Sequence, residues 1–259
     1  MQSKRFKYFI LLLLIVASMA IIFFGRQISQ KKNYEQRLES VNVTMKSEKS
    51  RLNNLHDSVN QLFVSPESHL LNSGVTMDQL EDLRTNVNAV KTTADDFQIK
   101  EVDFPQKMAK VHQQKKAVLK KLDEALVECN LQDKINNLFQ PENVNWQTLN
   151  PLAVIQLNNQ QAAINEINEQ LAVIPANDWL DLAKNYLNIA TDQTNQIAGS
   201  LDLLNKLAPN GQLAPDATSE EYQQLVNSLY SINNDNLANQ LSQKAREVAD
   251  QLRAAGKMT

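Results

Sequence analysis

Hydrophobic residues are continuous only near the start of the chain, where an apolar run extends from Tyr8 to Phe24 and is followed by Gly25. A helix of about 17 residues is roughly 26 Å long, close to the thickness of the hydrocarbon core of a membrane. Basic residues flank the run on both sides, and Ser18 is its only clearly polar member. The pattern predicts a transmembrane anchor over residues 8–25, after a short cytoplasmic tail, residues 1–7.

The same run has a second interpretation as a cleaved signal peptide, because Ser18-Met19-Ala20 offers small residues ahead of a cleavage point. Cleavage there would leave four apolar residues exposed at the new N-terminus, whereas an anchor uses them all, so the anchor is favoured. Positive charge on both flanks leaves the orientation almost tied. The short tail favours a signal-anchor, with the C-terminal region extracellular at the cell membrane. The reverse orientation would make a cytoplasm-facing coiled-coil scaffold.

Beyond the run, apolar residues recur at alternating steps of three and four, the spacing of a coiled-coil seam. The positions are Tyr34, Leu38, Val41, Met45, Leu52, Leu55, Val59 and Leu62. No Gly or Pro interrupts the pattern before Pro66, so one long helix is expected, with residues 26–58 as a helical stalk. Near Leu52 to Leu62 the favoured partner of the seam is a later helix of the same chain. Nearer the membrane, a second copy of the stalk becomes a candidate partner, giving a homodimer through Tyr34, Leu38, Val41 and Met45.

An internal repeat follows the stalk. Three helical patterns end in a similar motif, each soon followed by a proline and a polar loop: Val59-Asn60-Gln61-Leu62-Phe63, Ile135-Asn136-Asn137-Leu138-Phe139 and Leu204-Asn205-Lys206-Leu207-Ala208. A short helix is expected after each loop, over residues 77–93, 151–173 and 219–232. Thr76 with Gln79, and Thr218 with Glu221, have the spacing of a capping box. In the middle copy, Asn150 is the expected N-cap, with Pro151 at the first helical position.

A longer helix is expected after each short one, beginning near Phe104-Pro105, Asn177-Asp178 and Asn234-Asp235. The first two end in the next copy of the motif, so neighbouring modules share a helix. The sequence therefore predicts an all-α fold in which the anchor and the coiled-coil-like stalk precede three-helix modules arranged as an elongated rod. The modules cover residues 59–134, 135–203 and 204–259.

Composition agrees with a helical protein, because the 259 residues include only 5 Gly and 6% aromatic residues. A formal net charge of −3 does not predict nucleic-acid binding. Cys129 is the only cysteine, so no internal disulfide can form, and its helical neighbours suggest a half-buried apolar role rather than a reactive thiol.

No motif for catalysis, a cofactor or a metal is present in the sequence. The three histidines lie far apart, and none has metal-ligand spacing with another His, Cys or carboxylate. There is no glycine-rich phosphate loop and no nucleophile elbow. The sequence therefore predicts a protein that acts by binding rather than by catalysis.

The densest basic run offers one candidate site. Met108, Val111, Val118 and Leu122 share a helical face, and five lysines fall outside that face: Lys107, Lys110, Lys116, Lys120 and Lys121. A solvated face on a core helix is the favoured interpretation. The functional alternative is a contact surface for an anionic polymer such as teichoic acid, or for lipid headgroups. Trp146 and Trp179 are further candidates, as sugar-stacking platforms, although core roles are favoured for both.

The repeated motif, the proline-containing loop and the capped helices after Val75-Thr76 and Ala217-Thr218 resemble helical repeats in surface proteins of Gram-positive bacteria. The resemblance covers about residues 52–254 and looks most like the extracellular part of the mid-cell-anchored protein Z group of cell-division proteins. It implies a single-pass membrane protein that associates with peptidoglycan outside the cell. In that family a long cytoplasmic tail engages the division ring, and Met1 to Lys7 is too short for such a tail. Only the wall-facing role is therefore expected here.

Overall fold

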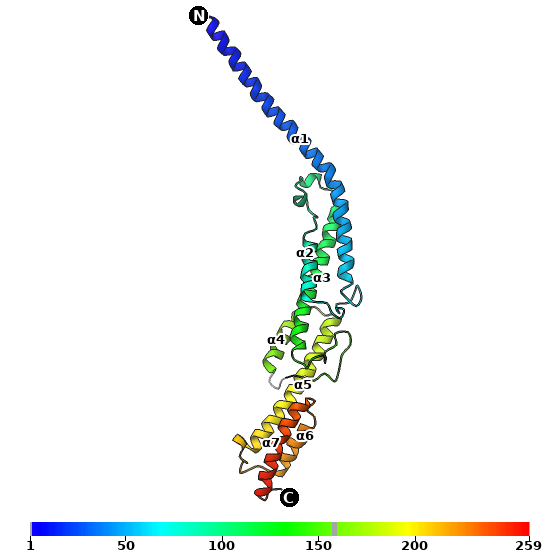
Figure 1. Ribbon diagram of the computed structural model, residues 1–259, viewed down its shortest axis with the longest axis vertical. Coiled ribbons are helices and arrows are strands. Elements are labelled where there is room, and N and C mark those ends of the chain that lie inside the picture. Colours follow the sequence, from blue (N-terminus) through cyan, green and yellow to red (C-terminus); the bar gives the residue numbers. More distant parts are fainter. Residues whose placement is uncertain (1, 157–159, 259) are drawn as a thin grey trace. The chain divides into compact units, whose positions relative to one another are not determined.

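The computed structural model describes residues 2–156 and 160–258, with side chains described for residues 26, 27, 29, 31–156 and 160–258. Seven α-helices form in this part of the chain (Figure 1): α1 Gln2–Asn60, α2 Met77–Asn88, α3 Lys107–Asn136, α4 Gln161–Leu171, α5 Asp178–Leu207, α6 Ser219–Leu229 and α7 Asp235–Ala254. Three short 3-10 helices, η1 Asp95–Phe97, η2 Glu101–Asp103 and η3 Pro209–Gly211, lie in the connections. The predicted all-α class is confirmed.

The predicted anchor, residues 8–25, belongs to the part of α1 whose side chains lie outside the described residues. Over the side chains that are described, no helix combines the length and the hydrophobicity that crossing a membrane requires. The anchor and the tail before it stay predictions.

Most helix starts lie where the sequence predicts them. The hydroxyl of Thr76 accepts from Gln79 N at 3.3 Å, and Thr218 and Glu221 form both bonds of a capping box. Asn177 caps α5 by accepting from Leu180 N, and Asn234 caps α7 by accepting from Leu237 N. These predictions are confirmed, and each rests on a hydrogen bond that spans only three residues.

The predicted start of the middle short helix is wrong, because α4 begins at Gln161 rather than at Pro151. The Asn150 side chain instead accepts from Leu152 N at 3.1 Å and donates to Asn143 O at 2.8 Å. An Asn that bonds the backbone two residues on forms a turn that competes with helix initiation. The chain then runs extended as far as Ile155, which pairs with Phe139 in an isolated antiparallel bridge.

The three copies of the repeated motif share one main-chain hydrogen bond. The carbonyl of the fourth motif residue accepts from an N–H beyond the loop: Leu62 from Asn72 at 2.7 Å, Leu138 from Gln156 at 2.9 Å, and Leu207 from Ala214 at 2.8 Å. In the first two copies a second bond closes the loop, from Val64 N to Leu70 O and from Gln140 N to Val154 O. The third copy has Pro209 at the position of Val64 and Gln140, and proline has no N–H to donate.

The chain divides into two compact units, residues 1–58 with 82–121, and residues 59–81 with 122–259. The boundaries fall inside α1, α2 and α3. The predicted modules, residues 59–134, 135–203 and 204–259, stay predictions.

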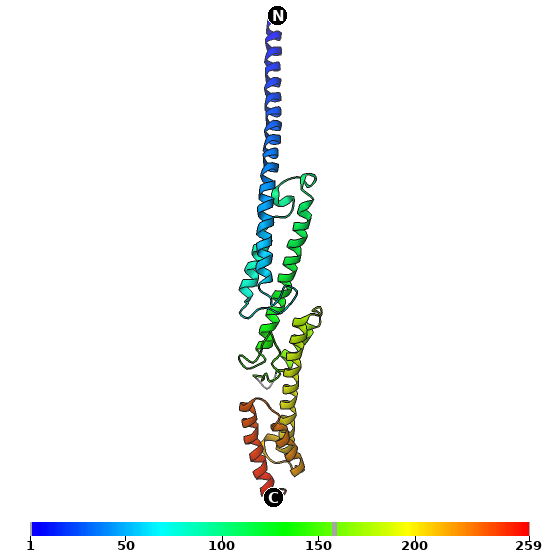
Figure 2. The ribbon, with the colours of Figure 1, turned by 90° about the vertical axis from the view of Figure 1, so that its right-hand side faces the viewer.

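In the first unit, the second half of α1 lies beside the first half of α3 (Figure 2). The Gln114 amide of α3 donates to Asn53 of α1 at 3.2 Å. Buried apolar residues come from both helices, from the end of α2 and from the segment between α2 and α3: Val41, Met45, Leu52, Val87, Val90, Phe97, Ile99, Met108, Val111 and Val118.

In the second unit, α5 contacts α4, α6 and α7, so it is the central helix of this core. Its largest buried side chains, Trp179 and Tyr186, are fully covered. The Tyr186 hydroxyl donates to Asn145 O at 3.0 Å and accepts from Asn145 N and Asn150 N, both at 2.9 Å. One aromatic residue of α5 therefore fixes the loop that follows α3.

Candidate functional site

The lysine face of α3, defined as Lys107, Lys110, Lys116, Lys120 and Lys121, is amphipathic as expected. Met108, Val111 and Val118 are buried on the opposite side. The first four lysines are exposed and Lys121 is half-buried. Lys120 and Lys121 have further interactions within the chain, so the charge offered to a ligand comes mainly from Lys107, Lys110 and Lys116.

Lys115 stands apart from this face. Its ammonium group donates to Asn88 O at 2.8 Å and to Val90 O at 2.7 Å. These carbonyls lie at and just beyond the C-terminus of α2, where helical carbonyls lack intrahelical partners and attract a positive charge. Lys115 is therefore a structural residue.

The apolar seam proposed for self-association is largely covered by the chain itself. Val41 and Met45 are buried, and Tyr34 and Leu38 are half-buried. The segment between α2 and α3 runs along α1, with bonds from Lys91 N to Glu48 and from Arg37 to Gln98 O. The chain itself therefore covers Val41 and Met45. Self-association through these residues is untested and loses its physical premise.

Tyr34 of α1 holds the C-terminal end of the segment between α2 and α3. Its hydroxyl donates to Asp103 Oδ2 at 2.5 Å and accepts from Lys100 N at 3.1 Å. The Lys100 ammonium group lies 5.5 Å from the centre of the ring, within cation–π range. The hydrogen bond to Asp103 raises the pKa of Tyr34 above its usual value. This aromatic residue therefore serves intramolecular contacts.

A buried polar cluster in the second unit was not anticipated from the sequence. Glu128 of α3 is almost completely covered, and its Oε1 lies 3.2 Å from His69 Nδ1 and 3.0 Å from Asn177 Nδ2. Oε2 has no hydrogen-bond partner among the residues that the structure describes. Burial raises the pKa of Glu128 to about 8, with the negative charges of Glu124 and Asp178 adding to it and the bond from Asn177 opposing it.

Asp178, next to Asn177, completes this cluster. Its carboxylate accepts from the Ser68 hydroxyl at 2.5 Å, from His69 N at 3.0 Å and from Trp179 N at 3.0 Å. Burial acts to raise the pKa of Asp178, but these three bonds outweigh it and the pKa is lowered. The pKa values of the two carboxyl groups are therefore shifted in opposite directions, which favours a neutral Glu128 and a charged Asp178 at neutral pH. Their contacts with Ser68, His69 and Asn177 connect the loop after α1 to α3 and α5.

The two tryptophans have different environments. Trp179 is fully buried, so the core role favoured for it is confirmed. Trp146 is only partly buried and stacks on Trp179, with ring centres 5.9 Å apart and an interplanar angle of 13°. Its indole N–H donates to Asn136 Oδ1 at 2.9 Å. Trp146 lines a small surface pocket of roughly 220 Å³ together with Asn136, Gln140, Pro141, Glu142 and Val144.

Glu142 in this pocket has an unusual backbone conformation, with φ of 63°. Asn143 N donates to Gln140 O at 3.2 Å, so residues 140–143 form a turn with Pro141 and Glu142 at its centre. Proline followed by a residue with positive φ is the pattern of a type II turn, which normally has Gly or Asn at the second central position. A Glu there costs about 1–2 kcal/mol of backbone strain.

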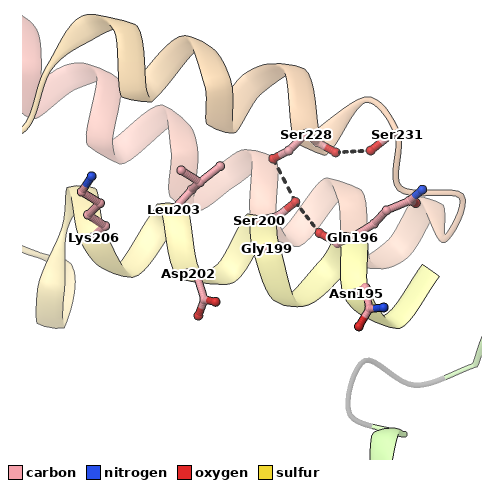
Figure 3. Close-up of a pocket in the computed structure, with 9 residues that line it drawn as sticks. All are labelled: Asn195, Gln196, Gly199, Ser200, Asp202, Leu203, Lys206, Ser228 and Ser231. Atoms are coloured by element: carbon pink, nitrogen blue, oxygen red, sulfur yellow. Dashed lines mark hydrogen bonds between the residues drawn. The ribbon is translucent and has the colours of Figure 1, made fainter. Parts of the chain in front are cut away.

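A wider groove of roughly 540 Å³ lies between α5 and α6 (Figure 3). Ser228 of α6 donates to Leu225 O and accepts from Ser200 of α5 at 2.9 Å. Lys206 pairs with Glu221 at 2.6 Å. Figure 3 shows the side chains of Asn195 and Asp202 directed away from α6. The charged residues that line the groove are thus either paired or turned outward, and the groove offers no charged anchor for a ligand.

Comparison with known proteins adds no relative. Neither protein-family models, nor curated proteins, nor solved structures match the chain. The candidate sites therefore rest on the chemistry of this chain alone.

The single cysteine fits the apolar role expected of it. Cys129 is buried, and burial raises the pKa of its thiol. Within the described part of the chain, no three His, Cys, Asp or Glu residues are grouped as a metal site requires.

Two residues missed by sequence reasoning had a readable signal. Glu128 lies three residues after Ala125 and three before Leu131, which places a carboxyl group on the buried face of α3. Glu142 directly follows Pro141, which places it at a turn position that favours Gly.

Proposed function

We propose that this protein is a single-pass, membrane-anchored, non-enzymatic cell-surface protein whose helical modules contact an anionic polymer of the cell wall. The observation that carries the proposal is the lysine face of α3, which is held outward because the opposite side of the helix is buried. The proposed anchor is residues 8–25, and the C-terminal region is extracellular. Teichoic acid, or peptidoglycan that bears it, is the proposed partner, and the resemblance to division proteins adds a link to cell division.

The continuity of α1 supports this arrangement. The helix runs from Gln2 to Asn60 and thus continues without an interruption from the proposed anchor into residues 26–58. Its 35 residues beyond Gly25 correspond to roughly 50 Å of helix. In the proposed arrangement only the part of this length before Tyr34 is a spacer from the membrane, because from Tyr34 onward α1 contacts the segment between α2 and α3.

Electrostatic contact explains the expected binding behaviour. One exposed ion pair contributes only about 0–1 kcal/mol, so useful affinity needs several lysines acting together. The screening length falls from about 10 Å at 0.1 M salt to about 3 Å at 1 M. Binding through the lysine face should therefore be graded with the number of lysines and should largely disappear over this range of salt.

The test is co-sedimentation of the full chain, in detergent, with purified cell-wall sacculi with and without teichoic acid. Changing Lys107, Lys110 and Lys116 to Gln removes the charge that the lysine face mainly offers and keeps helix propensity. A matched control changes three exposed lysines elsewhere, Lys46, Lys184 and Lys244, to Gln. The proposal requires loss of binding in the first variant and retention in the second. Equal binding by both variants would show that the lysine face is only a solvated surface and does not bind the polymer.

The alternative, a cytoplasm-facing membrane-anchored scaffold, is decided by orientation. Cys129 is buried and a poor target for labelling, so a reporter is better placed at Val102, which is 85% exposed. A Val102→Cys variant in a Cys129→Ala background should react with a membrane-impermeant thiol reagent in intact, wall-permeable cells. Reaction only after lysis would establish the cytoplasm-facing scaffold instead.

A further inference from the structure

The pocket beside Trp146 has walls of distinct chemistry. Its indole ring, Pro141 and Val144 supply apolar surface, while Asn136, Gln140 and Glu142 supply polar groups. At roughly 220 Å³ it is smaller than the pockets that enclose drug-sized ligands. It suits one side chain or a similarly small group.

Hydrogen-bonding capacity in the pocket favours acceptors. The Trp146 N–H is already donated to Asn136, and Pro141 has no N–H. Glu142 is exposed and, among the described residues, has no ion-pair partner. The acceptors in the pocket that can still bind a ligand are the two carboxylate oxygens of Glu142, the Gln140 amide oxygen and the second lone pairs of Asn136 Oδ1 and Pro141 O. The amides of Asn136 and Gln140 are the only donors left among the lining side chains, so the pocket is matched to a donor-rich cation.

The pocket is also preorganised. Stacking on Trp179 and the bond to Asn136 fix the Trp146 ring from two directions. The Tyr186 hydroxyl fixes the backbone on both sides of Trp146, at Asn145 and Asn150. The turn holds Glu142 in a backbone conformation that glycine would adopt more readily, and residues kept in such conformations cluster at binding sites.

The geometry points to a binding site for a primary ammonium group on an aliphatic stem, such as the lysine side chain of a partner peptide. In this site the stem lies against Trp146, Pro141 and Val144, and the ammonium group pairs with Glu142 and bonds the Gln140 amide oxygen. A cation beside an indole ring is further attracted by its π face. A single carboxylate and a single ring make this a weak subsite, one contact of a larger interface.

The test follows the indole N–H resonances of the full chain in detergent by NMR, with Trp146 and Trp179 distinguished by a Trp146→Phe variant. N-acetyl-lysine methylamide is the probe, and the norleucine analogue, which has the stem without the charge, is its control. The lysine probe should shift the Trp146 signal in a saturable way and the norleucine probe should not. Raising salt from 0.1 to 1 M should weaken the binding.

Variants locate the interaction. Glu142→Gln removes the charge and should lower the affinity for the lysine probe about three- to tenfold. Glu142→Asn, which suits positive φ better, should do the same, so the loss does not depend on turn strain. Glu169→Gln removes an exposed carboxylate on α4 and should leave the affinity unchanged. No saturable shift, equal binding of the two probes, equal loss in Glu169→Gln, or response only to a neutral sugar such as N-acetylglucosamine would each overturn the assignment. None of these outcomes depends on binding through the lysine face.

Discussion

The side-chain amide of Asn177 joins a helix start to a buried carboxyl group. Its oxygen accepts from Leu180 N at 2.7 Å and so caps α5, while its nitrogen donates to Glu128 Oε1 at 3.0 Å. One side chain thus forms hydrogen bonds both with a free N–H at the start of α5 and with a buried carboxyl group on α3. The stability of this junction depends on the protonation state of Glu128, because burial disfavours a charged carboxylate there.

The free energy of unfolding should therefore depend on pH through Glu128. Its pKa in the folded protein, about 8, is above the ordinary value of 4.5. The folded state binds the proton more tightly, so this contribution is fully present below about pH 4.5 and is lost as pH rises through about 8. Stability relative to a Glu128→Gln variant should fall across this window, by at most about 1.4 kcal/mol per pH unit.

Urea unfolding followed by tryptophan fluorescence measures this effect, because Trp179 lies two residues from Asn177. Comparing the wild type with Glu128→Gln at each pH isolates the part of the pH dependence that requires the Glu128 carboxyl group. Glu169→Gln is the control, and its difference from the wild type should be nearly constant with pH. A Glu128→Gln difference that is equally flat between pH 5 and pH 8 would show that the carboxyl group is not held neutral.

Replacing Glu142 by Gly should stabilise the protein. Glycine adopts a φ of 63° without the steric cost of a side chain, although it loses more freedom on folding. The net gain should be about 0.5–1 kcal/mol, measured by the urea midpoint. Gln140→Gly, at a turn position without positive φ, should be destabilising by a similar amount. A Glu142→Gly protein less stable than the wild type would refute the strained turn.

Adjacent lysines on α3 should respond differently to loss of charge. Lys115→Met removes two charge-assisted bonds to the end of α2 and should cost about 1–2 kcal/mol, whereas Lys116→Met should remain within about 0.5 kcal/mol of the wild type. Met preserves helix propensity at both positions. Hydrogen exchange of the amides near Val90 reports the local effect. Equal protection in the two variants would count against the capping role.

The all-α class and most helix starts follow from local sequence. Thr76, Asn177, Thr218 and Asn234 bond backbone groups within three residues, so the cap and its partner are readable together. The same local rule failed at Asn150, because its short-range bond to Leu152 builds a turn and the following segment is closed by the bond between Leu138 and Gln156, 18 residues apart.

The sequence by itself determined which residues could cap, break or face the interior of a helix, since these properties depend on spacing along the chain. Only the tertiary structure decided which helix faces are buried by other segments of the chain. Val41 and Met45 are buried by a segment about 50 residues away. Burial also raises the pKa of Glu128, whose contacts His69 and Asn177 lie 59 and 49 residues away along the chain. Burial and the pKa shifts it causes depend on contacts between distant segments, and spacing within one helix carries no information about them.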